Sequence, residues 1–187
     1  MINITDYGRL GWNIKSFREI KCMTQKELAS ICGTSENTII HAEHGHKIDT
    51  YTAYKISHEL SVSLDTILLP LVRFDVFDSV CTTREKIDLI RSFSFWLSHY
   101  KRDHRFTNRD IAKMLDARQY TIVTYLKENS CMLPSLDALE YFSSRENVTI
   151  SYMLGDSDKR IGKARYIRVL AMSGRITGES RGSKLII

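Results

Sequence analysis

Apolar residues recur with helical spacing through residues 23–69, and polar caps and glycines divide the pattern into four short helices. Thr24 caps the first helix, and Glu27, three positions later, completes a capping box. Gly33 and Gly45 end the first and second helices, because glycine tolerates the left-handed conformation that closes a helix. The predicted apolar face of the first helix consists of Leu28, Ala29 and Ile31.

The second of these helices, which begins after Thr34 or Ser35, has an apolar face and a polar face. Ile39 and Ala42 share the apolar face. The other face carries Glu36, Asn37, Ile40, His41 and His44. Two short helices joined by a glycine turn, the second with a polar outward face, are typical of a helix-turn-helix, which lays its second helix in the major groove of DNA.

A further helix is predicted in front of these four, over residues 12–21. Residues 1–11 are expected to form a short arm. The predicted inward face of this helix consists of Trp12, Ile14, Phe17 and Ile20.

The five predicted helices resemble the helix-turn-helix family of phage repressors and Cro proteins (the XRE family). Two positions depart from the family pattern: Asp49 stands where a proline is usual, and Tyr54 where a leucine is usual. Both departures fall on the fourth helix of the group. The resemblance is carried by Thr24, Gln25, Glu27, Leu28, Ala29, Gly33, Ser35, Ile39, Glu43, Gly45, Ile56, Leu60, Val62, Leu64, Asp65 and Leu68.

The resemblance implies that Glu36, Asn37 and His41 read base edges from the helix at 35–44. Such roles suit their chemistry, because asparagine bonds adenine bidentately and a carboxylate accepts from cytosine N4. Without the resemblance, these three would be a solvated helix face. The resemblance also implies an ion pair between Arg18 and Glu43 that orients Arg18 towards phosphate. The remaining DNA-binding residues predicted for this half are Arg18, Gln25, Ser35, Thr38, His44 and Lys47.

The second half of the chain repeats the first at an offset of 83 positions. The run from Thr24 to Ala29 falls on 107–112, Ile39 falls on Ile122, and Arg18 on Lys101. After a longer loop, Pro134 and Ser135 open the fourth helix of this copy. Further on, Leu60, Val62 and Leu68 are matched to Phe142 or its neighbour, Val148 and Leu154.

The recognition helix of the second copy, residues 118–127, is degenerate. Leu126 replaces the glutamate and Glu128 the glycine, so the ion pair and the turn are both lost. Two interpretations stay open: this copy also reads DNA, or it serves dimerisation or packing between domains. The residues predicted to contact DNA in the first case are Arg118, Gln119, Tyr120, Thr124 and Lys127.

The basic excess of the chain lies at its C-terminal end. The 187 residues carry a net charge of +5, and residues 157–187 alone hold eight Lys/Arg against two acidic residues. A basic segment strengthens attraction to phosphate through counterion release, although a solvated tail would look the same. A last basic helix is predicted over 158–172.

Several functional classes find no support in the sequence. No basic segment followed by an apolar core opens the sequence, so secretion is not expected, and no apolar stretch is long enough to cross a bilayer. The four cysteines are scattered, with Cys32 expected as a buried thiol, and the cluster His41, His44 and His46 has no further ligand that would complete a metal site. No catalytic motif appears, so neither an enzyme nor a cofactor or small-molecule ligand is expected.

The sequence therefore predicts an all-α protein with two tandem helix-turn-helix (lambda-repressor-like) domains and a basic C-terminal helix or tail. The expected boundaries are 1–69, a linker at 70–84, 85–156 and 157–187. We expect a cytoplasmic transcriptional regulator that binds double-stranded DNA as a homodimer. The alternative is an antitoxin-like or anti-repressor protein whose second domain and tail mediate dimerisation or partner binding.

Overall fold

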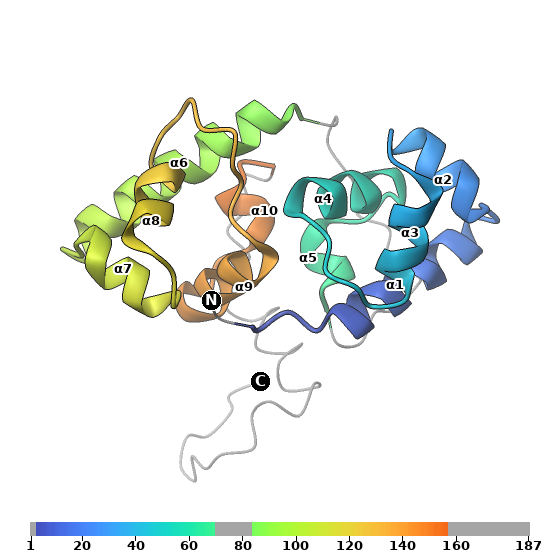
Figure 1. Ribbon diagram of the computed structural model, residues 1–187, viewed down its shortest axis with the longest axis horizontal. Coiled ribbons are helices and arrows are strands. Elements are labelled where there is room, and N and C mark those ends of the chain that lie inside the picture. Colours follow the sequence, from blue (N-terminus) through green and yellow to red (C-terminus); the bar gives the residue numbers. More distant parts are fainter. Residues whose placement is uncertain (1–2, 70–83, 157–187) are drawn as a thin grey trace, which may run out of the picture.

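The computed structural model describes residues 3–69 and 84–156, and over these ranges every regular element is a helix (Figure 1). The predicted all-α fold is thus confirmed for the described residues. The predicted linker, apart from Arg84, and the predicted basic helix and tail lie outside them. The helices are α1 (Tyr7–Ile20), α2 (Gln25–Ile31), α3 (Glu36–Glu43), α4 (Thr50–Glu59), α5 (Leu64–Ile67), α6 (Lys86–Asp103), α7 (Asn108–Met114), α8 (Gln119–Tyr125), α9 (Leu136–Glu146) and α10 (Ile150–Met153).

The first helix begins earlier than its sequence pattern suggested. Asp6 caps α1 by accepting a hydrogen bond from the backbone N–H of Arg9, so the predicted arm is partly helical. The buried stripe is Leu10, Ile14 and Phe17 at spacings of four and three, which is the spacing of one helix face. The expected inward positions Trp12 and Ile20 are exposed. Ile31 of α2, also expected to face the core, is exposed as well.

The second half repeats the helix order and the caps of the first. Capping boxes start both α2 and α7, from Thr24 with Glu27 and from Thr107 with Asp110. The left-handed residues before and after α2 also recur 83 positions later, each with positive φ. These are Cys22 and Gly33 in the first half, and Arg105 and Asp116 in the second.

From the fourth helix of each half onward, the two halves correspond at an offset of 86 positions rather than 83. Asp49 and Ser135 cap α4 and α9, and Ser63 and Thr149 cap α5 and α10. The longer loop between α8 and α9 accounts for the difference. In this register the counterpart of Phe142 is Ile56, and both are buried. The predicted match of Leu60 with Phe142 or its neighbour is therefore wrong.

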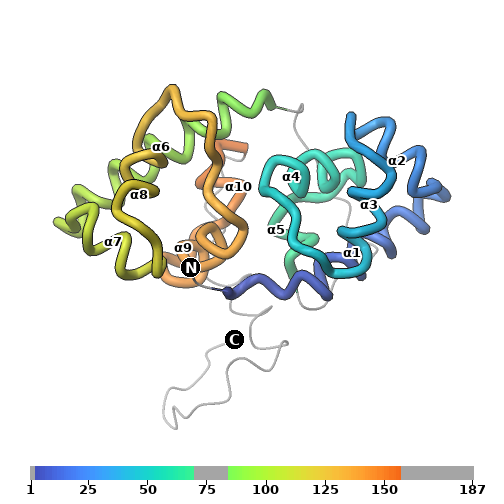
Figure 2. Tube along the Cα trace, in the orientation of Figure 1, coloured from blue at the N-terminus to red at the C-terminus, as the bar shows by residue number. Residues whose placement is uncertain are grey.

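The two halves lie side by side, with α4, α5, α9 and α10 at the centre and the helix pairs α2–α3 and α7–α8 on the outside (Figure 2). Helix α5 packs against α10, while α2 packs on α3 and α7 on α8. Buried apolar residues of both halves belong to one continuous cluster. The two halves therefore share one core.

Candidate nucleic-acid interface

Helix α3 presents a polar face to solvent because its apolar face is fixed in the core. Ser35 caps it, with the side chain accepting from the Thr38 backbone N–H at 3.1 Å. Ile39 and Ala42 are buried. The three residues predicted to read bases, Glu36, Asn37 and His41, are all exposed on the remaining surface. His44 is exposed there too.

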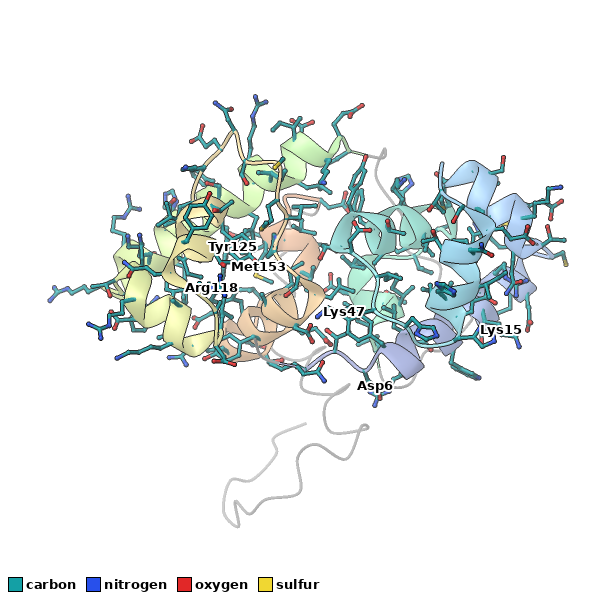
Figure 3. All side chains as sticks on the ribbon, in the orientation of Figure 1. Asp6, Lys15, Lys47, Arg118, Tyr125 and Met153 are labelled. Atoms are coloured by element: carbon teal, nitrogen blue, oxygen red, sulfur yellow. The ribbon has the colours of Figure 1, made fainter. Side chains whose placement is uncertain are left out.

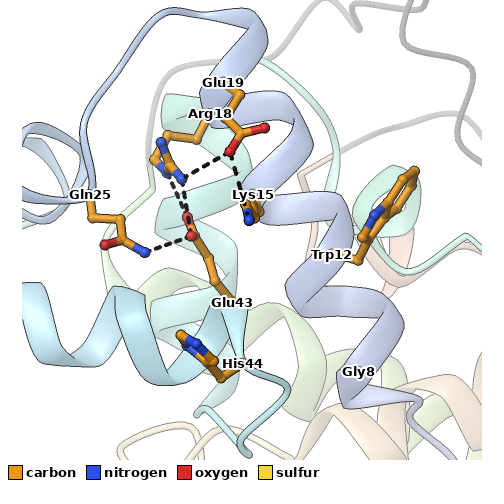
Figure 4. Close-up of a pocket in the computed structure, with 8 residues that line it drawn as sticks. All are labelled: Gly8, Trp12, Lys15, Arg18, Glu19, Gln25, Glu43 and His44. Atoms are coloured by element: carbon orange, nitrogen blue, oxygen red, sulfur yellow. Dashed lines mark hydrogen bonds and ion pairs between the residues drawn. The ribbon is translucent and has the colours of Figure 1, made fainter.

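An ion pair between α1 and the end of α3 fixes the orientation of that face (Figure 4). Arg18 Nε donates to Glu43 Oε1 at 2.6 Å and Arg18 Nη2 donates to Glu43 Oε2 at 3.1 Å. A third guanidinium nitrogen donates to the Met23 carbonyl oxygen at 2.7 Å. The hydrogen bond to Glu43 raises the pKa of Arg18, and only 8% of this residue is exposed. Arg18 thus serves first to hold α3 against α1 and the start of α2.

Gln25, the first residue of α2, joins the same network. Its side-chain amide nitrogen donates to Glu43 Oε2 at 2.7 Å. Glu43 therefore receives hydrogen bonds from two elements, α1 and α2, at the C-terminal end of α3. Together these contacts set the position of α3 relative to both of its neighbours.

Gly8 and Gly11 of α1 let this helix approach the end of α3 closely, and neither was among the predicted functional positions. A Cβ at Gly11 would lie 2.2 Å from the Ala42 carbonyl oxygen, which no side chain permits. Gly45 has a φ of +80°, and a Cβ added at Gly45 would lie 2.9 Å from the Cα of Gly8. Glycines three positions apart in α1 were the available signal, because that spacing falls on one helix face.

A groove opens beside this junction, between α1, the start of α2 and the end of α3 (Figure 4). Trp12 is 55% exposed at this groove, with Lys15 and Glu19 further along α1. The residues that line the groove are Gly8, Trp12, Lys15, Arg18, Glu19, Gln25, Glu43 and His44.

Lys47 does not stand free beside α3, as a simple phosphate contact would. Its ammonium forms an ion pair at 2.9 Å with Asp137 of the second half. Figure 3 shows Lys47 near the centre of the view, between the two halves. His44 Nδ1 lies 2.7 Å from the Ile40 carbonyl oxygen, and the rings of His41 and His46 are 5.2 Å apart. Within 3–69 and 84–156, no group of three or more His, Cys, Asp or Glu could hold a metal ion.

Helix α8 presents a comparable face in the second half. Gln119 and Tyr120 are exposed, Tyr120 to 74%, while Ile122 and Tyr125 are buried. The Thr124 hydroxyl donates to the Tyr120 carbonyl oxygen at 2.9 Å. Arg118 at the start and Lys127 after the end are both exposed.

Helix α8 lacks a counterpart of the Arg18–Glu43 ion pair that fixes α3, and a different contact holds it. Leu126 stands in the place of Glu43 and is partly buried against the core. Its carbonyl oxygen accepts from the Ser94 hydroxyl of α6 at 2.8 Å. Ser94 and Leu126 thus hold α8 to α6 without charge.

Residues 14–67 match the family model described as helix-turn-helix. The match runs from within α1 to the end of α5, and the second half lies outside it. Comparisons with curated proteins and with solved structures gave no match. No helix within the described ranges is both long enough and apolar enough to cross a membrane. Residues 14–67 therefore contain a helix-turn-helix similar to those of the XRE type, with α2 and α3 as its helix pair.

Proposed function

We propose that the protein is a cytoplasmic transcriptional regulator that binds double-stranded DNA sequence-specifically and reads the major groove with α3. The observation that carries the proposal is the exposed row of Glu36, Asn37 and His41 on a helix held by the Arg18–Glu43 pair. A fixed helix presents its donors and acceptors to base edges at low entropic cost.

The contacts around Glu43 are compatible with phosphate binding by Gln25. An amide nitrogen carries two hydrogens, so the one donated to Glu43 leaves a second for a phosphate oxygen. Thr38, whose hydroxyl lies 2.8 Å from that of Ser35, is in the first turn of α3 beside Asn37, and His44 is the C-cap of this helix. Contacts of this kind set register without reading sequence.

The basic segment at 157–187 supplies the charge that the rest of the chain lacks. Residues 1–156 carry 19 basic and 20 acidic groups, so non-specific attraction to DNA falls mainly to the C-terminal end. We therefore assign sequence reading to α3 and much of the salt-dependent affinity to that segment.

A second candidate function is a protein-interaction regulator, antitoxin-like or anti-repressor, that uses the second half for its partner. It is favoured by the large exposed apolar side chains on that half: Ile87, Phe95, Tyr120 and Met132. In that case DNA binding would remain after the second half is altered, and only partner capture would be lost.

The proposal is tested by selecting duplexes from random DNA with the full chain and measuring affinity for the selected sequence. Asn37→Ala should lower affinity for that sequence by about 1–3 kcal/mol and barely change binding to unrelated DNA. Ser98→Ala, at an exposed position on α6, is the matched control and should change neither. Equal losses on both DNAs would remove Asn37 from the reading set.

A further inference from the structure

The two halves contact each other through equivalent positions. Ser151 is the counterpart of Asp65 at the offset of 86, and the Ser151 hydroxyl donates to Asp65 Oδ2 at 2.6 Å. Two equivalent positions in two like bodies touch each other where both lie next to the axis that relates the bodies, and Figure 1 shows α4 and α5 across the centre from their counterparts α9 and α10. The contact between Asp65 and Ser151 therefore marks a pseudo-two-fold axis between α5 and α10.

The neighbouring contacts agree with this axis. The Thr50 hydroxyl donates to the Pro134 carbonyl oxygen at 2.6 Å. The same axis would place Ile48 opposite Leu136, the counterparts of Pro134 and Thr50, and both residues are buried in the shared core. The packing of α5 on α10 thus has the self-complementary form of a dimer interface, built within one chain.

Divergent residues make the interface specific to the two halves of one chain. At the axis, two copies of the first half would place Asp65 against Asp65, whereas Ser151 offers a donor instead. Asp137 of α9 is fully buried and accepts from the backbone N–H groups of Ile4 and Thr5 and from Lys47. Its counterpart in the first half is Tyr51, so this contact exists on one side only.

The axis places both recognition helices on one face of the molecule. In Figure 1, which looks nearly along the axis, α3 and α8 lie on opposite sides of the centre and both on the viewer's side, in front of α1 and α6. Figure 2 shows the same arrangement along the Cα trace. Two helix-turn-helix units related in this way meet two half-sites of inverted orientation on one side of a duplex.

The reading faces of the two helices differ in chemistry. At the positions of Glu36, Asn37 and His41, helix α8 carries Gln119, Tyr120 and Thr124. Gln119 and Tyr120 project from a short helix whose other face is fixed by Ile122 and Tyr125 in the core. A glutamine pairs with adenine edges, and an aromatic ring contacts the thymine methyl group.

We propose that the chain is a built-in pseudo-dimer, in which α3 reads one half-site and α8 reads a second, inverted half-site of different sequence. The proposal rests on the proposed function and extends it to the second half. One chain then occupies a whole operator. The centres of its two half-sites lie about one helical turn of DNA apart, or a multiple of one turn. A homodimer of the chain would accordingly address four half-sites.

The experiment is a selection of random duplexes by the full chain, repeated with two variants, and a measurement of the mass of each complex. The expected result is one chain per operator and two unlike inverted half-sites. Asn37→Ala should relax the selected sequence in one half-site. Gln119→Ala combined with Tyr120→Ala should relax it in the other and weaken binding to the wild-type operator about tenfold. Both variants alter exposed side chains, and a thermal melt checks that each stays folded.

Three results would overturn the proposal. Two chains on an operator of identical half-sites, with the α8 variant unaffected, would show that two copies of α3 do the reading. If the α8 variant binds DNA as the wild type does but changes its oligomeric state in size-exclusion chromatography, the second half serves assembly and not DNA reading. A wild-type chain that selects no sequence would overturn the proposed function itself. An α8 variant that binds as the wild type does, beside an Asn37→Ala variant that loses selectivity, would overturn only this inference.

Discussion

The carboxylate of Asp65 caps a helix that belongs to the other half of the chain. It accepts hydrogen bonds from the backbone N–H groups of Ile150 at 2.7 Å and Ser151 at 2.9 Å, in addition to the Ser151 hydroxyl. Ile150 and Ser151 are the first two residues of α10, whose N–H groups have no partner within their own helix. A side chain of α5 thus completes the hydrogen bonding of α10 and joins the two halves.

Removing one partner of the Arg18–Glu43 pair is expected to destabilise the first half strongly. Glu43→Gln leaves the guanidinium of Arg18, which is mostly buried, without its charge partner, so the free energy of unfolding should fall by about 3 kcal/mol. Lys15→Ala removes an exposed pair with Glu19 at 4.0 Å and should cost less than about 1 kcal/mol. Urea denaturation of both variants checks this. Similar losses for the two would show that the buried pair contributes no more than a surface one.

Replacing both members of the pair separates stability from orientation. Arg18→Met with Glu43→Leu should recover much of the stability lost by Glu43→Gln, because a well-packed apolar pair avoids the desolvation of two charges. Gln25 loses its partner in this variant, so α3 is no longer fixed to the start of α2. Operator affinity should therefore stay low while the melting temperature recovers. Recovery of both would mean that the pair serves stability alone.

Acid should weaken the contact between the two halves through Asp137. Burial by itself would raise the pKa of Asp137, but hydrogen bonds from Lys47, Thr5 and Ile4 outweigh burial and hold the pKa below its ordinary value. A lowered pKa in the folded state gives stability that is present above the unfolded pKa of about 3.9 and is lost as pH falls through the folded value.

The measurement is the free energy of unfolding in urea between about pH 5.5 and pH 3. Asp137→Asn should be less stable than the wild type at the upper end and show a flatter fall towards the lower end. Asp103→Asn, at an exposed position, should follow the wild-type curve. The pKa of Asp65 is raised by burial and acts with the opposite sign, but it is common to all three proteins. If the free energies of unfolding of Asp137→Asn and the wild type fall in parallel with pH, Asp137 is not the source of the acid-dependent loss of stability.

Local sequence signals predicted the first half well because they act over a few residues. The capping box of Thr24 and Glu27 and the positive φ of Gly33 and Gly45 are present as expected. These features depend on backbone groups within one turn, so neighbouring residues are enough to specify them. The Arg18–Glu43 pair came instead from the resemblance to a family, since no local rule links positions so far apart.

The contacts that organise the second half could not be read from periodicity. Asp137 was not singled out, because its partners Ile4, Thr5 and Lys47 lie far away in the sequence and depend on how the two halves pack. A helix that begins at Trp12 predicts an inward Trp12, whereas α1 begins at Tyr7. With the first turn of α1 included, Leu10 joins Ile14 on one face and Trp12 falls outside it.

The buried thiol of Cys32 should resist modification while the chain is folded. Burial, together with the charge of Glu59, raises the pKa of Cys32 to about 11, so little thiolate is present near pH 8. Cys22 and Cys131 are exposed and should react. Brief treatment with N-ethylmaleimide followed by peptide mass mapping distinguishes these sites, and the same treatment in urea should label Cys32 too. Rapid labelling of Cys32 in the folded chain would show that α2 and the core around it open readily.

The cap that Asp65 gives to α10 should depend more on the carboxylate than on the Ser151 hydroxyl. Asp65→Ala leaves the backbone N–H groups of Ile150 and Ser151, both buried residues, without their acceptor, so the free energy of unfolding should fall by about 2–3 kcal/mol. Ser151→Ala removes one hydroxyl and leaves both backbone bonds, so its cost should be about 1 kcal/mol.

Urea denaturation of the two variants and of the double variant completes a cycle that measures the coupling between the two positions. After Asp65→Ala, the further change Ser151→Ala should cost little, because the hydroxyl has already lost its acceptor. Asp65→Asn should fall between the wild type and Asp65→Ala, since an amide oxygen can accept from one N–H but the amide nitrogen cannot accept from the other. If Ser151→Ala costs as much as Asp65→Ala, the hydroxyl and not the backbone cap would be what holds α5 to α10.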